Sequence, residues 1–214
     1  MRLIVTAGPT REYIDTVRFI TNASGGRMGC AVARAAAEAG HHVTVLLAQG
    51  LVSSATSALT QNTTVVPFVT VEDLKGELRA RFAECDALVM AAAVGDFRLE
   101  EPAKSKLSRS AGPINLRLLP TEDVVAAVCA AKRDDQVTIT FAVEDGAVDE
   151  MDAKARAEMA AKKADYVVVN TPVAIGRDDS RACVLSASGV VLPWAMRSKQ
   201  QLAREIVNLL TGSE

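Results

Sequence analysis

Short apolar runs alternate with helical patterns along this chain, and that alternation limits the folds open to it. Most of the runs are continuous apolar stretches, which are typical of strands buried on both faces of a sheet. Strands are expected at residues 3–6, 43–47, 64–67, 87–91, 137–141 and 166–169. Helices are expected at residues 27–39, 71–82, 121–131, 149–163 and 199–210. The order predicts an α/β fold, a Rossmann-like and mostly parallel sheet with helices on both faces.

Local signals mark the ends of two of these helices. Thr121 follows Pro120 and can cap a helix, and the acidic Glu122 and Asp123 suit its first turn. Gly40 can take the left-handed conformation that closes the first long helix.

Two segments depart from the alternation. Residues 98–118 are polar, carry Lys104, Lys106 and Arg109, and run into an alternating stretch at 114–118, which predicts a basic flap ending in an extra strand. Near the carboxyl end, residues 183–187 and 190–194 flank Ser188 and Gly189, a pattern that predicts a C-terminal β-hairpin. The chain contains no internal repeat, so we expect one domain over residues 1–214.

Composition excludes several classes of partner. At 214 residues with 49% hydrophobic content, the chain can bury a full core. Aromatic residues make up only 4% and the net charge is -2, so base stacking and phosphate neutralisation by a nucleic-acid-binding surface are not expected. No apolar run reaches the roughly 18 residues of a membrane span. Because the sequence opens with a strand, we expect no signal peptide and a cytoplasmic protein.

The cysteines and histidines do not form a reactive group. The four cysteines are scattered without a CxxC pair, so they are expected to be small buried hydrophobes, outside metal sites and disulfides. They are Cys30, Cys85, Cys129 and Cys183. His41 and His42 open a strand at the end of the sheet opposite a nucleotide site, where we expect them to face solvent. Hydrolysis by a Ser-His-Asp triad is therefore a poor hypothesis.

A glycine-rich turn predicts where an anion binds. Residues 24–29 lie between the first strand and the first helix, where free backbone N–H groups and the helix dipole favour a phosphate. Ligands of open α/β sheets lie beyond the carboxyl ends of the strands. The segments that leave those ends, 7–29, 91–110, 142–148 and 170–181, carry a set of polar residues. The set is Asn22, Asp96, Lys106, Arg109, Glu144, Asp145, Asn170 and Asp178. The cations of the flap could close over a polyphosphate.

An ordered series of motifs resembles phosphopantothenoylcysteine synthetase, also called phosphopantothenate–cysteine ligase. Residues 6–22 are similar to the opening signature of that family, TAGPTREPIDPVRFISN, and residues 24–29 are similar to its SSGKMG turn. Residues 92–98 match AAVADFR, residues 106–109 stand at its KIKK flap motif, residues 141–144 parallel FAAE, and residues 165–170 parallel the DLIVAN strand. The resemblance covers nearly the whole chain.

The resemblance implies a ligase that uses neither a His nor a Cys nucleophile. The carboxylate of 4′-phosphopantothenate would attack the α-phosphate of CTP or ATP, pyrophosphate would leave with Mg²⁺, and the amine of cysteine would then attack the acyl-nucleotide. Such chemistry depends on positioning and charge neutralisation. The resemblance also implies a homodimer in which flaps reach the neighbouring subunit, and a separate phosphopantothenoylcysteine decarboxylase as a possible partner, with no flavin in this chain.

The same resemblance implies roles for individual residues. Asn22 and Lys106 would be catalytic, and Arg18 and Asn170 would join Asn22 in binding substrate. The remaining positions would hold the nucleotide, with the backbone of Ala92 and Ala93 against its base. The nucleotide set is Gly8, Pro9, Thr10, Ser24, Gly25, Gly26, Arg27, Ala92, Ala93, Asp96, Lys106, Arg109 and Phe141. No metal ligands are predicted.

Two other functions remain open at this point. The Gly25-Gly26-x-x-Gly29 turn is compatible with an NAD(P)- or flavin-binding oxidoreductase, although no GxGxxG follows the first strand and no acidic residue ends the second. A non-catalytic paralogue that binds a phosphorylated ligand is the third hypothesis. The flap favours it slightly, because Ser108 interrupts the lysine motif and Arg27 replaces the lysine of the turn.

Overall fold

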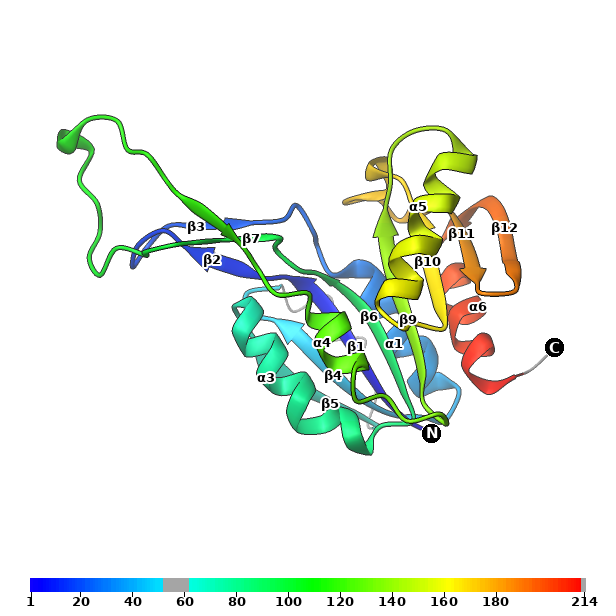
Figure 1. The fold of residues 1–214 in the computed structure, drawn as a ribbon. Coiled ribbons are helices and arrows are strands. Elements are labelled where there is room, and N and C mark those ends of the chain that lie inside the picture. The colour runs from blue at the N-terminus through cyan, green and yellow to red at the C-terminus, as the bar shows by residue number, and fades with distance from the viewer. Residues whose placement is uncertain (52–61, 213–214) are drawn as a thin grey trace.

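The computed structural model describes residues 1–51 and 62–212, which form an α/β fold around an eight-stranded sheet (Figure 1). The strand order is β12-β11-β10-β9-β6-β1-β4-β5. The six strands from β10 to β5 are parallel, and β11 and β12 add an antiparallel hairpin at one edge. The strands are β1 (Arg2–Pro9), β4 (His42–Ala48), β5 (Thr63–Phe68), β6 (Ala87–Ala93), β9 (Val137–Val143), β10 (Tyr166–Asn170), β11 (Asp179–Ser186) and β12 (Gly189–Ser198).

Helices cover both faces of the sheet. On one face lie α1 (Arg27–Glu38) and α6 (Lys199–Thr211), and on the other lie α3 (Val71–Arg81), α4 (Val124–Cys129) and α5 (Val148–Ala161). Three short 3₁₀ helices are η1 (Phe82–Glu84), η2 (Arg109–Ala111) and η3 (Pro172–Ala174). Within the described ranges, every helix is too short or too polar to cross a bilayer.

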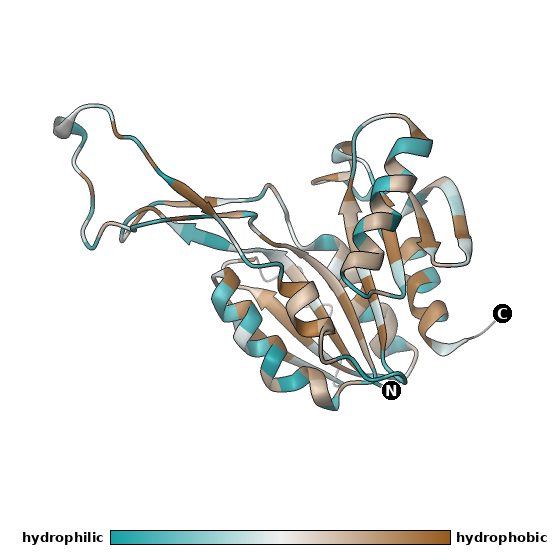
Figure 2. Cartoon of the chain, viewed as in Figure 1, coloured by the Kyte–Doolittle hydropathy of each residue, from teal (hydrophilic) through white to brown (hydrophobic). Residues whose placement is uncertain are grey.

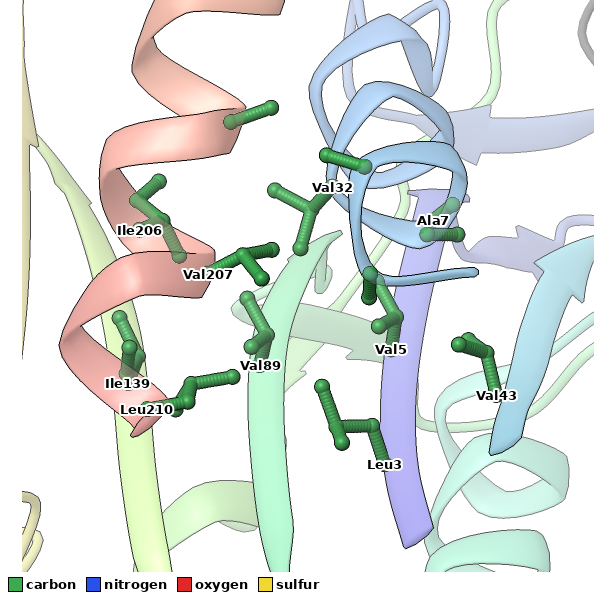
Figure 3. Close-up of a cluster of buried hydrophobic side chains, with 14 of the residues drawn as sticks. Leu3, Val5, Ala7, Val32, Val43, Val89, Ile139, Ile206, Val207 and Leu210 are labelled. Carbon is green, nitrogen blue, oxygen red and sulfur yellow. The ribbon is translucent and has the colours of Figure 1, made fainter. Parts of the chain in front are cut away.

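The core follows from the alternation of side chains along each strand. In β1, Leu3 and Val5 point to the layer of α1 and α6, and Ile4 points to the opposite layer of α3 and α4. Figure 3 shows the first layer, where Val207 of α6 lies close to Val32 of α1 above the sheet. Figure 2 shows the central strands of the sheet as mostly hydrophobic, as two covered faces require.

Two pairs of short strands leave the body of the molecule together. They are β2 (Arg11–Tyr13) with β3 (Phe19–Thr21), and β7 (Phe97–Leu99) with β8 (Leu118–Pro120). We call residues 11–21 and 97–120 the arm. It projects away from the sheet, and the flap segment forms its tip (Figure 1).

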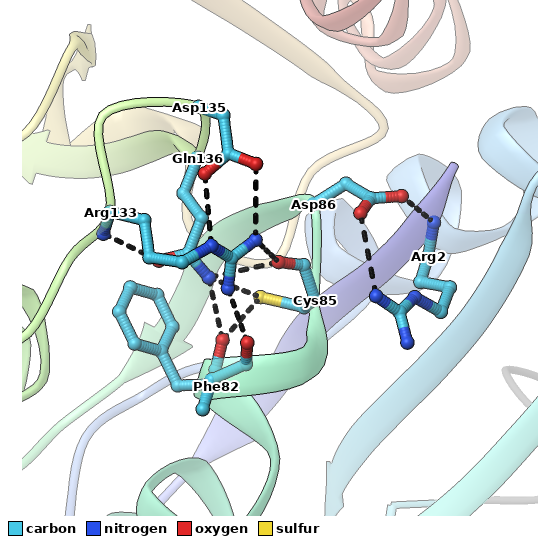
Figure 4. Close-up of polar contacts among 8 residues, drawn as sticks. Arg2, Phe82, Cys85, Asp86, Arg133, Asp135 and Gln136 are labelled. Carbon is cyan, nitrogen blue, oxygen red and sulfur yellow. Dashed lines mark hydrogen bonds and ion pairs between the residues drawn. The ribbon is translucent and has the colours of Figure 1, made fainter.

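The amino-terminal edge of the sheet is tied by a dense polar network (Figure 4). Gln136 is buried, and its Nε2 donates to the carbonyl oxygens of Phe82 at 2.6 Å and Cys85 at 2.8 Å. Arg133 also donates to the Cys85 carbonyl, at 3.2 Å, and pairs with Asp135 at 2.9 Å. The polar atoms of these side chains are bonded to one another and to the backbone, so we expect this network to stabilise the fold.

The predicted fold class is confirmed, including the parallel sheet, the helices on both faces and the C-terminal hairpin. Gly40 ends α1 in the left-handed conformation, with φ of 83°. The four cysteines are buried, as expected. His41 corrects one expectation: it is buried, because it packs under the start of β4, and only His42 is exposed. Desolvation lowers the pKa of His41.

Two expected boundaries are wrong. The helix after Pro120 begins only at Val124, because Asp123 is its N-cap and accepts from Ala126 N at 3.0 Å. The Thr121 hydroxyl instead donates to Gly95 O at 2.7 Å. The extra strand expected at 114–118 lies further along, at β8. The β2–β3 hairpin, which separates β1 from the glycine-rich turn, was not predicted.

Candidate functional site

A cleft of about 670 Å³ opens at the carboxyl ends of the central strands. The ends of β6, β9 and β10 form its floor, and the glycine-rich turn, α5 and the start of α6 contribute its walls. This is the edge at which parallel α/β sheets bind ligands. The polar and apolar groups that line it are therefore the candidates for recognition.

The N-terminus of α1 forms a wall of the cleft that is suited to an anion. Its N-cap is Gly26, with φ of 68°, and within the described chain no side chain caps the helix and no acidic residue lies in its first turn. The first backbone N–H groups and the positive end of the helix dipole therefore remain available to an anion. Arg27 adds a positive charge at the rim, where its Nη1 lies 2.8 Å from Asp178 Oδ1.

Glycine is required in this turn because the backbone approaches β1 closely. A Cβ on Gly26 would lie 3.2 Å from Gly8 N, and a Cβ on Gly29 would lie 2.5 Å from Thr6 O. The Gly8–Gly26 contact places Gly8 behind the turn, away from the cleft lining. Gly8 thus shapes the anion wall without forming part of it.

The end of β6 presents backbone to the cleft. β6 pairs with β1 as far as Ala93, but with β9 only from Ala87 to Met90. The side of residues 91–93 that faces away from β1 therefore borders the cleft. Asn22 holds the following loop, since its Nδ2 donates to Val94 O at 2.9 Å. The turn and the loop after β6 are thus fixed to each other.

Charged side chains of α5 line the opposite wall. Lys154, Glu158 and Lys162 recur every four residues and so share one helix face. Lys154 Nζ lies 2.7 Å from the buried Glu144 carboxylate, and that pairing raises the pKa of Lys154. Lys162 lies 3.6 Å from Asp123. This wall offers cations that already have acidic partners.

Lys199 forms a corner of the cleft with β10 and β11. Its Nζ donates to the carbonyl oxygens of Ala174, at 3.1 Å, and Arg177. Desolvation, with a smaller contribution from the Arg27 charge, lowers the pKa of Lys199. Nearby, Asn170 Oδ1 and Ser180 Oγ are buried side-chain atoms without a hydrogen-bond partner. Unsatisfied buried polar atoms are uncommon in folded proteins and concentrate where ligands or waters bind.

Ten of the site residues expected from sequence lie together in the cleft. They are Asn22, Ser24, Gly25, Gly26, Arg27, Ala92, Ala93, Asp96, Phe141 and Asn170. Gly8, Pro9 and Thr10 lie outside the lining. Thr10 is buried and ties the end of β1 to the loop after β6, because its Oγ1 accepts from Gly95 N at 2.9 Å.

The three expected site residues of the arm are also outside this cleft. Lys106 and Arg109 are exposed at the flap, and Arg18 lies in the β2–β3 turn against Asp15. Because the arm projects from the body (Figure 1), the flap of a chain does not cover that chain's cleft. The structure therefore separates the predicted site into a cleft set and an arm set.

Sequence reasoning missed the lysines of the cleft. Lys154 and Lys162 could have been found from their spacing in the helix expected at 149–163, which places both on one face. Lys199 carries no such signal, because only the fold brings the start of α6 beside β11. The described residues include no group of three or more His, Cys, Asp or Glu side chains placed to hold a metal.

Comparison with known proteins identifies the family. The model of the DNA/pantothenate metabolism flavoprotein C-terminal domain matches residues 1–212. The chain belongs to this family. The phosphopantothenoylcysteine synthetase family expected from the motifs is therefore confirmed. The "Coenzyme A biosynthesis bifunctional protein CoaBC" of Mycobacterium bovis is 36% identical over 222 residues, which cover 98% of this chain and 51% of that protein.

Another relative has a different name. A "Cysteine/Cysteine sulfinic acid decarboxylase" from an unknown prokaryotic organism is 33% identical over 210 residues, covering 96% of this chain and 56% of that protein. The chain thus spans about half the length of these curated relatives.

Solved structures agree with the family. The C-terminal domain of a CoaBC protein has a TM-score of 0.78 at 27% identity, with 98% of this chain and 93% of that chain covered. A complex of the Cab2 mutant H337A with phosphopantothenate-cysteine has a TM-score of 0.79 at 15% identity, with 99% and 86% covered. At that identity the second structure supports the fold alone.

Proposed function

We propose that this chain is a phosphopantothenate–cysteine ligase. The carboxylate of 4′-phosphopantothenate attacks the α-phosphate of CTP or ATP, which forms an acyl-nucleotide mixed anhydride and releases pyrophosphate. The amine of cysteine then attacks the acyl carbon, so that an amide bond forms and the nucleoside monophosphate leaves. Residues 1–214 act as one ligase domain in this proposal.

The uncapped N-terminus of α1 at the cleft is the observation that carries the proposal. Four groups favour an anion there: the amides of the first turn, the helix dipole, Arg27 and the buried Lys199. The proposed reaction needs charge stabilised on phosphate groups in both steps and needs no His or Cys nucleophile. A relative named for coenzyme A biosynthesis supports the choice of substrates.

The cleft residues divide the work in this proposal. The turn from Ser24 to Arg27 holds phosphate, the backbone at Ala92 and Ala93 faces the base, and Phe141 packs beside the nucleotide. Asn22 contacts the acyl-nucleotide, and Asn170 binds substrate through its unpartnered Oδ1. The roles of Asn22 and Asn170 rest on the family motif as well as on their location in the cleft.

Mg²⁺ is proposed to enter with the triphosphate. This ion commonly takes one or two protein carboxylates together with substrate phosphates, and Asp96 offers an exposed carboxylate at the cleft. Bound there, the ion would neutralise charge on the pyrophosphate that leaves. Asp96 therefore lies where a nucleotide-bound ion would need a ligand.

The arm is proposed to complete the cleft of a second copy of the chain. Lys106 and Arg109 lie outside their own cleft, and the arm exposes large apolar side chains, which mark contact surfaces. Those side chains include Tyr13, Val17, Phe19, Phe97, Ile114, Leu116 and Leu118. A homodimer would bury them and bring each flap to its neighbour. The free cysteines fit the reducing cytoplasm as the place of work, where a separate decarboxylase could take the product.

A pyrophosphate-release assay tests the ligase. The protein is incubated with Mg²⁺, 4′-phosphopantothenate, cysteine and either CTP or ATP, and we expect pyrophosphate and phosphopantothenoylcysteine in equal amounts. Omission of phosphopantothenate should abolish release. Hydride transfer with a nicotinamide cofactor would support the oxidoreductase instead, and nucleotide binding without turnover would support a non-catalytic paralogue.

A further inference from the structure

A buried carboxylate joins the two halves of the arm. Asp15 lies in the turn between β2 and β3, and only 2% of its surface is exposed although the arm projects into solvent. Across from it runs the flap segment, which is more than 80 residues further along the chain. The contact between Asp15 and the flap is therefore a tertiary one, and we call it the clasp, made of Asp15, Arg18 and Leu107.

The clasp holds the backbone of Leu107 from both sides. Leu107 N donates to Asp15 Oδ2 at 3.1 Å, and Arg18 Nη2 donates to Leu107 O at 2.7 Å. Both the donor and the acceptor of this flap residue are thus bound to the β2–β3 turn. A third bond lies nearby, from Ala103 N to Ile14 O at 2.9 Å.

Asp15 also organises its own turn. Its Oδ1 accepts from Val17 N and Arg18 N, each at 2.8 Å, and its Oδ2 accepts from Arg18 Nε at 2.9 Å. The Arg18 guanidinium is the largest influence on Asp15 and holds the pKa of that carboxyl well below its usual range. The lowered pKa favours the ionised carboxylate that the clasp requires.

Leu107 is the immediate neighbour of Lys106, so the clasp also restricts the backbone that carries Lys106. A lysine on an exposed loop has a long, mobile stem, and its charge helps a reaction only when the backbone that carries it is fixed. Lys106 itself is exposed, so packing of its own side chain does not fix it. The bonds to Leu107 are what limit the place from which Lys106 reaches out.

We propose that Asp15 is a positioning residue for the ligase reaction, which anchors Leu107 and so fixes the flap that presents Lys106 to the nucleotide. This inference rests on the proposed function. Asp15 lines no part of the cleft and so acts through the flap, not on substrate. Arg18 closes the same clasp.

Hydrogen exchange of the flap tests the clasp without using activity. The full-length Asp15→Ala variant should exchange the Leu107 amide about tenfold faster than the unchanged protein, because the acceptor of that N–H is gone. Asp165→Ala is the matched control. Asp165 also accepts a backbone N–H, from Thr138 at 2.7 Å, and pairs with Lys132, but it lies at the amino-terminal edge of the sheet. Flap exchange that is equal in the Asp15 and Asp165 variants would overturn the clasp.

Steady-state kinetics then test the positioning role. We expect Asp15→Ala to lower kcat for pyrophosphate release by about tenfold to a hundredfold, with KM for the nucleotide changed less than about threefold. Asp15→Asn keeps an acceptor oxygen, so its kcat should lie between those of the unchanged protein and Asp15→Ala. Thermal unfolding of each variant confirms that the body remains folded. A faster-exchanging flap with unchanged kcat would overturn the positioning role. An unchanged protein that releases no pyrophosphate would overturn the proposed function instead, and the exchange result would still report on the clasp.

Discussion

The two edges of the parallel sheet use their polar groups in opposite ways. At the amino-terminal edge, Gln136 and Arg133 are bonded to backbone carbonyls and to Asp135, so little hydrogen-bonding capacity remains (Figure 4). At the carboxyl-terminal edge, the first turn of α1 lacks a side-chain cap within the described chain, and Asn170 Oδ1 has no partner. β6 and β9 thus begin beside a closed network of hydrogen bonds and end at an open recognition surface.

The difference teaches how one fold separates stability from chemistry. Saturated networks stabilise, because every buried polar group finds a partner. Unsaturated groups cost stability unless a ligand completes them. Substitutions at the two edges should therefore separate into losses of activity and losses of stability, and the following experiments measure that separation.

The largest effect is expected at Lys106. Lys106→Gln should lower kcat by about a hundredfold to a thousandfold, because a cation that meets charge developing on phosphate is lost. Nucleotide binding, measured by calorimetry, should change little. The neighbouring Lys104→Gln keeps the flap and is the matched control. An unchanged kcat in Lys106→Gln would remove this lysine from the mechanism.

Two buried cysteines, Cys85 and Cys183, should react slowly in the folded protein. Desolvation raises the pKa of the Cys85 thiol to about 11 and is the largest cause that brings the pKa of Cys183 to about 12. The thiolate is the reactive form, so at pH 8 both should react with a disulfide reagent at least about a hundredfold more slowly than in unfolded protein. Rates come from absorbance with and without denaturant. Rapid labelling of folded protein would show that these thiols are accessible.

A smaller loss of activity is expected at the turn. Asn22→Asp places a carboxylate where the acyl-phosphate is proposed to lie, and repulsion should lower kcat by about tenfold to a hundredfold. The bond from Asn22 Nδ2 to Val94 O is lost as well. Asn208→Asp, on the exposed side of α6, introduces the same charge away from the cleft. Equal kinetics in the two variants would place the acyl-phosphate elsewhere.

The opposite edge should lose stability without losing chemistry. Gln136→Ala removes the donor to the carbonyls of Phe82 and Cys85 and should lower the free energy of unfolding by about 2 kcal/mol. Turnover per folded molecule should stay the same. Denaturant titration measures the first and the pyrophosphate assay the second, with exposed Gln200→Ala as control. A loss of kcat in folded Gln136→Ala would end the separation between the two edges.

The sequence predicted the buried body better than the exposed arm. Continuous apolar runs such as 87–91 and 166–169 mark strands covered on both faces, and each lies within an observed strand. The β2–β3 hairpin gave no such signal, because its strands are three residues long and partly exposed, and β2 begins with the charged Arg11 and Glu12. The hydrophobic pattern of a sequence reflects burial, so it does not reveal short strands outside the core.

Hydrogen bonds of side chains to distant segments of the chain were the other feature that the sequence did not predict. Thr121 has the right chemistry for a helix cap, but its hydroxyl donates to Gly95, which only the tertiary fold brings near. His41 was expected in solvent because it lies at the end of the sheet opposite a nucleotide site, yet it is buried there. The cleft itself was well anticipated, since the carboxyl-edge rule and the family motifs both pointed to the turn and to the loop after β6.

The projection of the arm has a consequence for abundance. If the proposed dimer forms, a chain whose Lys106 lies outside its own cleft would depend on association with a second copy for every active site. The reaction rate would then rise with the square of the chain concentration in dilute solution. It would become linear only above the concentration at which the chains associate. Serial dilution would then lower the specific activity. A cell would have to keep the concentration of the chain above that threshold for the enzyme to be active.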